Sequence, residues 1–147
     1  MTRCFHHLVW STALLAAGLA GARGARAGDP QVDYMLECQG CHLGDGSGAP
    51  GRVPDLRDSV GRFLTVPGGR EYLVRVPGAA QSPLGDAELA EVLNWMVRRF
   101  GPAEVAAGFE PFAAPEVARL RRAPLLEVEP VRAALVQLMR APAQAEP

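Results

Sequence analysis

The sequence has 147 residues, and its 15 basic and 16 acidic residues give a formal net charge of −1. Hydrophobic residues make up 48% and charged residues 21% of the chain, which excludes general disorder, and the near-neutral charge argues against a nucleic-acid-binding protein. All 15 basic residues are arginine, which excludes mechanisms that need a lysine Schiff base or a P-loop lysine. Three cysteines are too few for a disulfide-stapled mini-protein.

Residues 1–27 have the pattern of an export signal. A short basic start precedes an apolar run from Leu8 to Ala22, and the small-residue pattern Ala-Arg-Ala at 25–27 marks a cleavage site, with a second possible cut after Ala22. As a helix the apolar run would rise about 22 Å, less than the ~30 Å of a bilayer core, which favours a cleaved signal over a retained anchor. We therefore expect a periplasmic protein that starts near Gly28, has no membrane span after signal removal, and carries a formal charge of −4 from 12 arginines and 16 acidic residues.

The first predicted element after the signal is a helix that leads into a haem-attachment motif. Asp29 suits the N-cap and Pro30 the first helical position. The helix runs into Cys38-Gln39-Gly40-Cys41-His42, the C-x-x-C-H signal for c-type haem. Two thiols at this spacing reach the two vinyl groups of one porphyrin, and the adjacent histidine supplies the proximal iron ligand. We therefore predict one covalent haem c, held by Cys38, Cys41 and His42.

Two other interpretations of the cysteine motif have less support. A zinc site needs about four ligands, and residues 28–147 contain no further cysteine or histidine. A thioredoxin-type redox pair needs a βαβ scaffold, whereas this sequence is poor in predicted strands and rich in proline and glycine.

The chain after His42 alternates loops with helices. A glycine-rich loop at 44–51 is expected to run along a haem edge. Residues 59–64 and 69–74 predict short helices, each closed by a Val-Pro-Gly turn. A longer helix is expected to be capped by Asp86 and ended by Gly101-Pro102, with an apolar stripe of helical period. The stripe consists of Leu89, Val92, Leu93, Met96, Val97 and Phe100.

Residues 29–101 resemble the class I cytochrome c family. Tyr34 holds the place of an aromatic residue four positions before the first haem cysteine, and Pro54-Asp55-Leu56 matches a Pro-x-Leu that follows the haem histidine. Trp95 matches an aromatic of the last helix that packs across the first. The resemblance implies an all-α fold, a small cytochrome c-like helical haem wrapper. It also implies that the Pro54 carbonyl accepts a hydrogen bond from Nδ1–H of His42 and orients the ring.

The sequence departs from this family at the sixth iron ligand. The family usually places an axial methionine in the loop before the last helix, but residues 76–84 contain neither methionine nor histidine. Met96 is a candidate distal ligand, although its position on the apolar stripe favours a core role and ligation would need the helix displaced. Met35 precedes the haem cysteines, and Met139 would have to fold back from the tail. The alternative is a vacant or water-bound distal site, which lowers the reduction potential and opens the iron to small ligands.

Residues 102–147 form a proline-rich C-terminal extension with two predicted helices. Pro115 opens one and Pro130 the other, and both carry apolar residues at helical spacing. Such stripes need burial, so we expect the extension to wrap its own haem domain; docking on a partner redox enzyme is the alternative. The predicted organisation is a signal peptide (1–27), a cytochrome c domain (28–101) and a helical extension (102–147).

Three arginines are candidate partners for the haem propionates. Arginine pairs well with carboxylates, and Arg52, Arg62 and Arg70 lie in or beside the predicted loops. A solvated surface position is the more usual place for any one of them.

The resulting hypothesis is an exported mono-haem c-type cytochrome that carries single electrons between periplasmic redox proteins and is not an enzyme. A haem sensor or small-ligand-binding protein with an open distal site is one alternative, and a haem subunit of a periplasmic dehydrogenase is another. A weak peroxidase has less support because the sequence offers no distal acid–base pair. The acidic mature chain would suit a basic redox partner.

Overall fold

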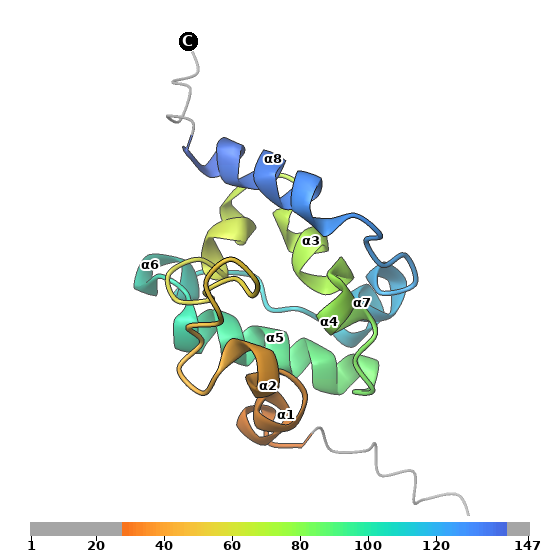
Figure 1. The fold of residues 1–147 in the computed structure, drawn as a ribbon. Helices are drawn as coiled ribbons and strands as arrows, with labels where there is room; N and C mark the ends of the chain where they lie inside the picture. The colour runs from red at the N-terminus through yellow and green to blue at the C-terminus, as the bar shows by residue number, and fades with distance from the viewer. Residues whose placement is uncertain (1–27, 141–147) are drawn as a thin grey trace, which may run out of the picture.

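The computed structural model describes residues 28–140, so the predicted signal and residues 141–147 lie outside it. Nine helical segments follow one another along this range (Figure 1). They are α1 (Pro30–Glu37), α2 (Gln39–His42), the 3₁₀ helix η1 (Gly61–Thr65), α3 (Gly69–Arg75), α4 (Pro77–Ala80), α5 (Asp86–Phe100), α6 (Ala103–Ala106), α7 (Ala114–Leu120) and α8 (Val128–Arg140). The only β-structure between residues 28 and 140 is an isolated bridge between Ala49 and Val53. The predicted all-α class is confirmed.

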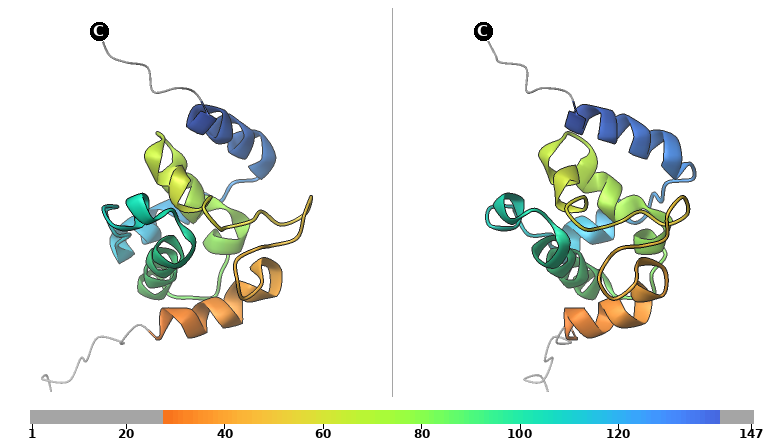
Figure 2. Two further views of the ribbon diagram at one scale, coloured as in Figure 1. Left: turned by 90° about the vertical axis from the view of Figure 1, so that its left-hand side faces the viewer. Right: turned by 60° about the vertical axis from the view of Figure 1, so that its left-hand side comes forward.

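The helices pack around α5, the longest of them. α1 and α7 both pack against α5, and α8 packs against η1 and α3. α1 and α2 lie together at one end of the molecule, and α8 lies at the opposite end, as all three views show (Figures 1 and 2). No helix of the described range has the length and apolar character needed to cross a membrane.

An aromatic contact joins the first helix to α5. Tyr34 is 1% exposed, and its ring centroid lies 5.0 Å from that of Trp95 and 5.4 Å from that of Phe100. Such tilted pairs stabilise a contact beyond the area that they bury. The Tyr34 hydroxyl also donates a hydrogen bond of 2.7 Å to the carbonyl of Leu43, just after the C-x-x-C-H motif. The predicted contact of Trp95 with the first helix is confirmed, and it fixes the motif to the core.

Two predicted details of the helix ends need correction. The Val-Pro-Gly at 76–78 closes α3 as predicted, with Val76 as its C-cap, but it does not form a turn, because Pro77 opens α4 in the first-turn position that its fixed φ favours. Asp86 is not the cap of α5: Gly85 holds that position with an extended backbone, and its N–H donates to Oε2 of Glu88 at 2.8 Å. The cap of α1 is as predicted, with Asp29 accepting from the backbone N–H of Gln31 at 2.9 Å.

The predicted C-terminal extension packs on the predicted cytochrome c domain in one continuous core. The extension residues Phe112, Val117, Leu120 and Leu135 are buried in the same hydrophobic cluster as residues of α3 and α5. The side chain of Asn94, 2% exposed, exchanges two hydrogen bonds with the backbone of Phe112. The extension therefore wraps its own domain as expected, with α8 starting two residues before Pro130 and a short unpredicted helix, α6, after Pro102.

Candidate haem site

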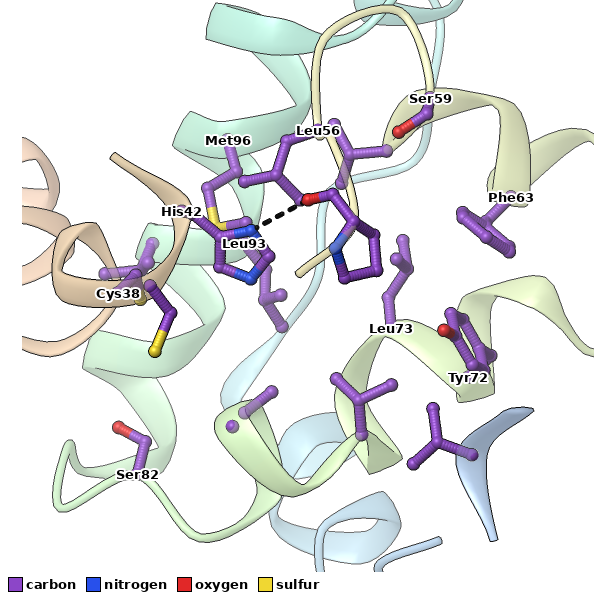
Figure 3. Close-up of a pocket in the computed structure, with 18 of the residues that line it drawn as sticks. Cys38, His42, Leu56, Ser59, Phe63, Tyr72, Leu73, Ser82, Leu93 and Met96 are labelled. Carbon is purple, nitrogen blue, oxygen red and sulfur yellow. Dashed lines mark hydrogen bonds between the residues drawn. The ribbon is translucent and has the colours of Figure 1, made fainter. Parts of the chain in front are cut away.

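A cavity of about 260 Å³ opens between α2, α3, α4, α5 and the start of α8 (Figure 3). Most of its wall is hydrophobic, as a porphyrin ring requires. The hydrophobic lining residues are Leu56, Val60, Phe63, Tyr72, Leu73, Val76, Ala79, Leu89, Val92, Leu93, Met96 and Val128.

The C-x-x-C-H motif winds through one helical turn at the edge of this cavity. The N–H groups of Cys41 and His42 both donate to the carbonyl of Cys38, at 3.2 and 3.0 Å, so all three side chains line the cavity. The two thiols are free, with Cys38 half-buried and Cys41 exposed. Burial raises the pKa of the Cys38 thiol to about 11, and the charges of Glu37 and Asp33 add to the rise.

The imidazole of His42 is oriented by a backbone carbonyl. Its Nδ1 lies 3.2 Å from the Pro54 oxygen, and since a carbonyl only accepts, Nδ1 carries the proton and Nε2 keeps its lone pair. In Figure 3 the Nε2 side of the ring faces the middle of the cavity. Burial lowers the pKa of His42, against the opposing effect of the Pro54 hydrogen bond, so the ring is neutral at neutral pH. A neutral imidazole with an oriented second nitrogen is the form that binds iron.

The glycine-rich loop supports the Pro54 carbonyl and does not line the cavity. Gly48 has φ +66°, and a Cβ at this position would lie 2.5 Å from the carbonyl oxygen of Val53 and 2.6 Å from that of Pro54. The Gly48 N–H also donates to the carbonyl of His42 at 3.1 Å. Residues 44–51 do not line the cavity, and Gly48 packs the loop behind Pro54; whether the loop runs along a haem edge stays a prediction.

The segment between α3 and α5 forms another part of the wall. Val76, Gly78, Ala79 and Ser82 line the cavity here, where the family usually places a methionine. Arg121 of the extension holds this segment: its guanidinium donates to the carbonyls of Ala80, Ser82 and Leu84 and to Asp86, at 2.5–3.1 Å. The clamp was not predicted, because it joins residues 35 to 41 positions apart.

The three methionines of the described range occupy different surroundings. Met96 is 8% exposed and lines the cavity from α5. Met139 packs half-buried on the core from α8 and is not a lining residue. Met35 is 51% exposed on α1.

The arginine that reaches the cavity is not one of the three candidates. Arg52 and Arg62 are exposed and are not lining residues. The donors of Arg70 are taken by the extension: Nε lies 2.6 Å from the Glu116 carboxylate, and the terminal nitrogens reach the carbonyls of Glu110 and Pro111. Arg132 of α8 lines the cavity instead. The sequence could have indicated Arg132, because it lies three residues before the buried Leu135 and so on the same face of the helix.

The side chains around this cavity fit a covalent haem. They supply two free thiols, an oriented imidazole and hydrophobic walls, and one wall holds a buried guanidinium nitrogen, Nε of Arg132, without a hydrogen-bond partner. Across residues 28–140 no three His, Cys, Asp or Glu side chains gather as a separate metal site would need.

Comparisons with known proteins give two relatives of the same name. One cytochrome c-552 of Thermus thermophilus is 36% identical over 126 residues, covering 74% of this chain and 82% of that protein. A second cytochrome c-552 of Thermus thermophilus is 38% identical over 103 residues, covering 58% and 79%. No protein-family model matches the chain. A share of 74% is about 109 of the 147 residues, more than the 28–101 range holds, so the likeness continues beyond that range.

Proposed function

The chain belongs to the class I family of c-type cytochromes, with covalent haem c as its cofactor, and from this premise we propose that it is an exported carrier of single electrons between periplasmic redox proteins. The bound haem supplies a one-electron Fe(III)/Fe(II) couple. In this proposal the protein supplies attachment, ligation and an apolar surrounding, and a carrier needs no catalytic residue.

Each residue of the site has a defined role in this proposal. The thiols of Cys38 and Cys41 would add across the haem vinyl groups to form thioethers, which would hold the cofactor beside the first two helices. His42 would be the proximal iron ligand through Nε2, and the Pro54 carbonyl orients its ring by accepting a hydrogen bond from Nδ1–H. Ligation by His42 needs no proton release at neutral pH, because burial keeps its imidazole neutral.

The observation that carries the proposal is that an oriented His42 and two free thiols line the same edge of a hydrophobic cavity. Such a site would hold a haem through its two vinyl groups and its iron in an apolar surrounding, and binding and orientation are what the protein supplies to a redox cofactor. The acidic mature chain favours a basic donor or acceptor through electrostatic steering.

The test uses full-length protein expressed with its signal in a bacterial host that matures c-type cytochromes. We expect periplasmic protein whose haem stays attached on a denaturing gel, and whose reduced form passes one electron per chain to a small basic redox protein in a stopped-flow experiment. A Cys38→Ala, Cys41→Ala double variant is expected to lose the attached haem. Periplasmic holoprotein that does not exchange electrons would refute the carrier function.

A second candidate function is small-ligand binding at the iron, as in a haem sensor. The observation that favours it is the wall formed by Val76, Gly78, Ala79 and Ser82, which offers no methionine or histidine to the iron. Carbon monoxide separates the candidates: rapid binding to the reduced protein together with slow electron exchange supports the sensor. A low-spin spectrum that carbon monoxide does not change supports the carrier.

To decide the role of Met96, we compare Met96→Leu with the wild type. We propose that Met96 packs against the haem and does not ligate it, so the variant is expected to keep the wild-type spectrum of reduced and oxidised haem. A change from low-spin to high-spin bands in Met96→Leu would establish Met96 as the distal ligand.

A further inference from the structure

The wall of the haem cavity that lies away from the cysteines contains two polar groups without hydrogen-bond partners. Nε of Arg132 is buried and unpaired in the described structure. Tyr72 is 6% exposed, and no hydrogen bond joins its hydroxyl to another residue between 28 and 140; Figure 3 draws that hydroxyl turned toward the cavity. Burying a guanidinium nitrogen without a hydrogen-bond acceptor costs free energy. The simplest explanation for the buried Nε of Arg132 is that its acceptor belongs to a bound group and not to the protein chain.

The two groups are close enough to affect each other's charge. Burial raises the pKa of the Tyr72 hydroxyl; the positive charge of Arg132 opposes the rise, and Glu129 adds to it. Both Tyr72 and Arg132 line the cavity, together with Val128 one turn before Arg132 on α8. The site therefore presents one fixed positive charge and one hydroxyl to whatever occupies this end of the cavity.

The chemistry of haem identifies the acceptor. The propionates of haem are carried by the two pyrrole rings opposite those that carry the vinyl groups, so a haem bonded through Cys38 and Cys41 extends its propionates away from α1 and α2. α8 lies at that opposite end of the molecule (Figures 1 and 2), and Tyr72 lies across the cavity from Cys38 (Figure 3). A carboxylate is also the partner that a guanidinium binds best.

We propose that Arg132 of the C-terminal extension binds a haem propionate, with the Tyr72 hydroxyl as a second donor. This inference rests on the proposed haem attachment at Cys38 and Cys41. It makes the extension part of the haem site: α8 brings a positive charge beside the cofactor. Because a nearby positive charge disfavours the ferric state, Arg132 raises the reduction potential of the protein.

The experiment compares three holoproteins: the wild type, Arg132→Gln and the matched control Arg140→Gln. Arg140 lies on the same helix, is exposed and does not line the cavity. At an ambient potential equal to the wild-type midpoint, the ratio of reduced to oxidised protein is expected to fall several-fold in Arg132→Gln and to stay unchanged in the control. A tenfold fall corresponds to about 59 mV for a one-electron couple. The propionate bending bands of the resonance Raman spectrum are expected to shift in Arg132→Gln only.

Two further variants keep the proposal testable if Arg132→Gln loads haem poorly. Arg132→Lys keeps the charge and is expected to recover most of the wild-type potential, while Tyr72→Phe is expected to shift the propionate bands with a smaller change in potential. Unchanged propionate bands in these variants, with haem still attached, would overturn the proposal. Altered carbon monoxide binding with unchanged propionate bands would also overturn the proposal, because Arg132 would then face the distal ligand of the iron and not a propionate. Wild-type protein without attached haem would refute the proposed attachment at Cys38 and Cys41. That result is distinct from a failure of the Arg132 proposal.

Discussion

Replacing Asn94 tests whether the C-terminal extension belongs to the folding unit of the haem domain. Asn94 lies on α5, and its amide exchanges bonds of 3.0 and 2.7 Å with the carbonyl and N–H of Phe112. Both residues are buried, at 2% and 3% exposure. Asn94→Leu has a similar size and makes neither bond. A buried backbone group left without a partner costs about 1–3 kcal/mol, so with two such groups we expect the free energy of unfolding to fall by about 2–6 kcal/mol.

Urea unfolding of the haem-loaded protein measures this loss through Trp95, whose fluorescence is quenched by haem in the folded state and appears on unfolding. The matched control is Gln137→Leu, an amide-to-leucine change at an exposed position of α8, which we expect to change stability by no more than about 0.5 kcal/mol. If Asn94→Leu stays within about 1 kcal/mol of the wild type, Phe112 does not depend on Asn94 and the extension is only loosely attached. If stability falls as expected and the haem spectra stay unchanged, the loss comes from the contact between α5 and the extension and not from a change in iron ligation.

Three further predictions address the surroundings of the haem. Gly48→Ala, with its Cβ placed 2.5 Å from the Val53 oxygen at φ +66°, is expected to displace Pro54, lower stability by at least about 2 kcal/mol and reduce haem loading, as measured on haem-stained gels. Arg121→Met removes the clamp on residues 80–86 and is expected to speed carbon monoxide binding to the reduced protein, so an equal stopped-flow rate would contradict the clamp. Arg70 lowers the pKa of Glu116 below its ordinary value of 4.5, so this ion pair stabilises the fold fully above pH 4.5 and loses its effect as the pH falls through the lowered pKa. Glu116→Gln is therefore expected to reduce stability at neutral pH but not at strongly acid pH, as followed by circular dichroism.

The parts of the site that the sequence predicted are those encoded within a few residues. The two thiols and the imidazole of the C-x-x-C-H motif occupy one helical turn, so their spacing alone indicates a shared face. α5 was predicted from a single apolar stripe, and its last residue, Phe100, agrees with the structure. The carbonyl that accepts the hydrogen bond from Nδ1–H of His42 is twelve residues away, and only the family resemblance pointed to Pro54.

The parts that were missed depend on contacts between distant segments. Arg70 was a reasonable partner for a propionate, but Glu116 lies 46 residues later in the chain and takes the same donors. A guanidinium pairs equally well with either carboxylate, so composition does not decide between them. Arg132 was missed for the same reason, because only the folding of α8 onto η1 and α3 brings it to the cavity.

The short segment between α3 and α5 explains why the extension is so closely joined to the haem domain. Residues 76–85 contain only one short helix, α4, and their carbonyls at Ala80, Ser82 and Leu84 bond to Arg121. The same segment lines the cavity and contains neither methionine nor histidine, so we expect its position to affect how far the iron is open to small molecules. Arg121 fixes that segment, and the loop that follows Arg121 leads into α8, which adds Val128 and Arg132 to the wall. We therefore expect two arginines of the extension to act on the haem in different ways: Arg121 on access to the iron, through the backbone that it binds, and Arg132 on the potential, through a propionate.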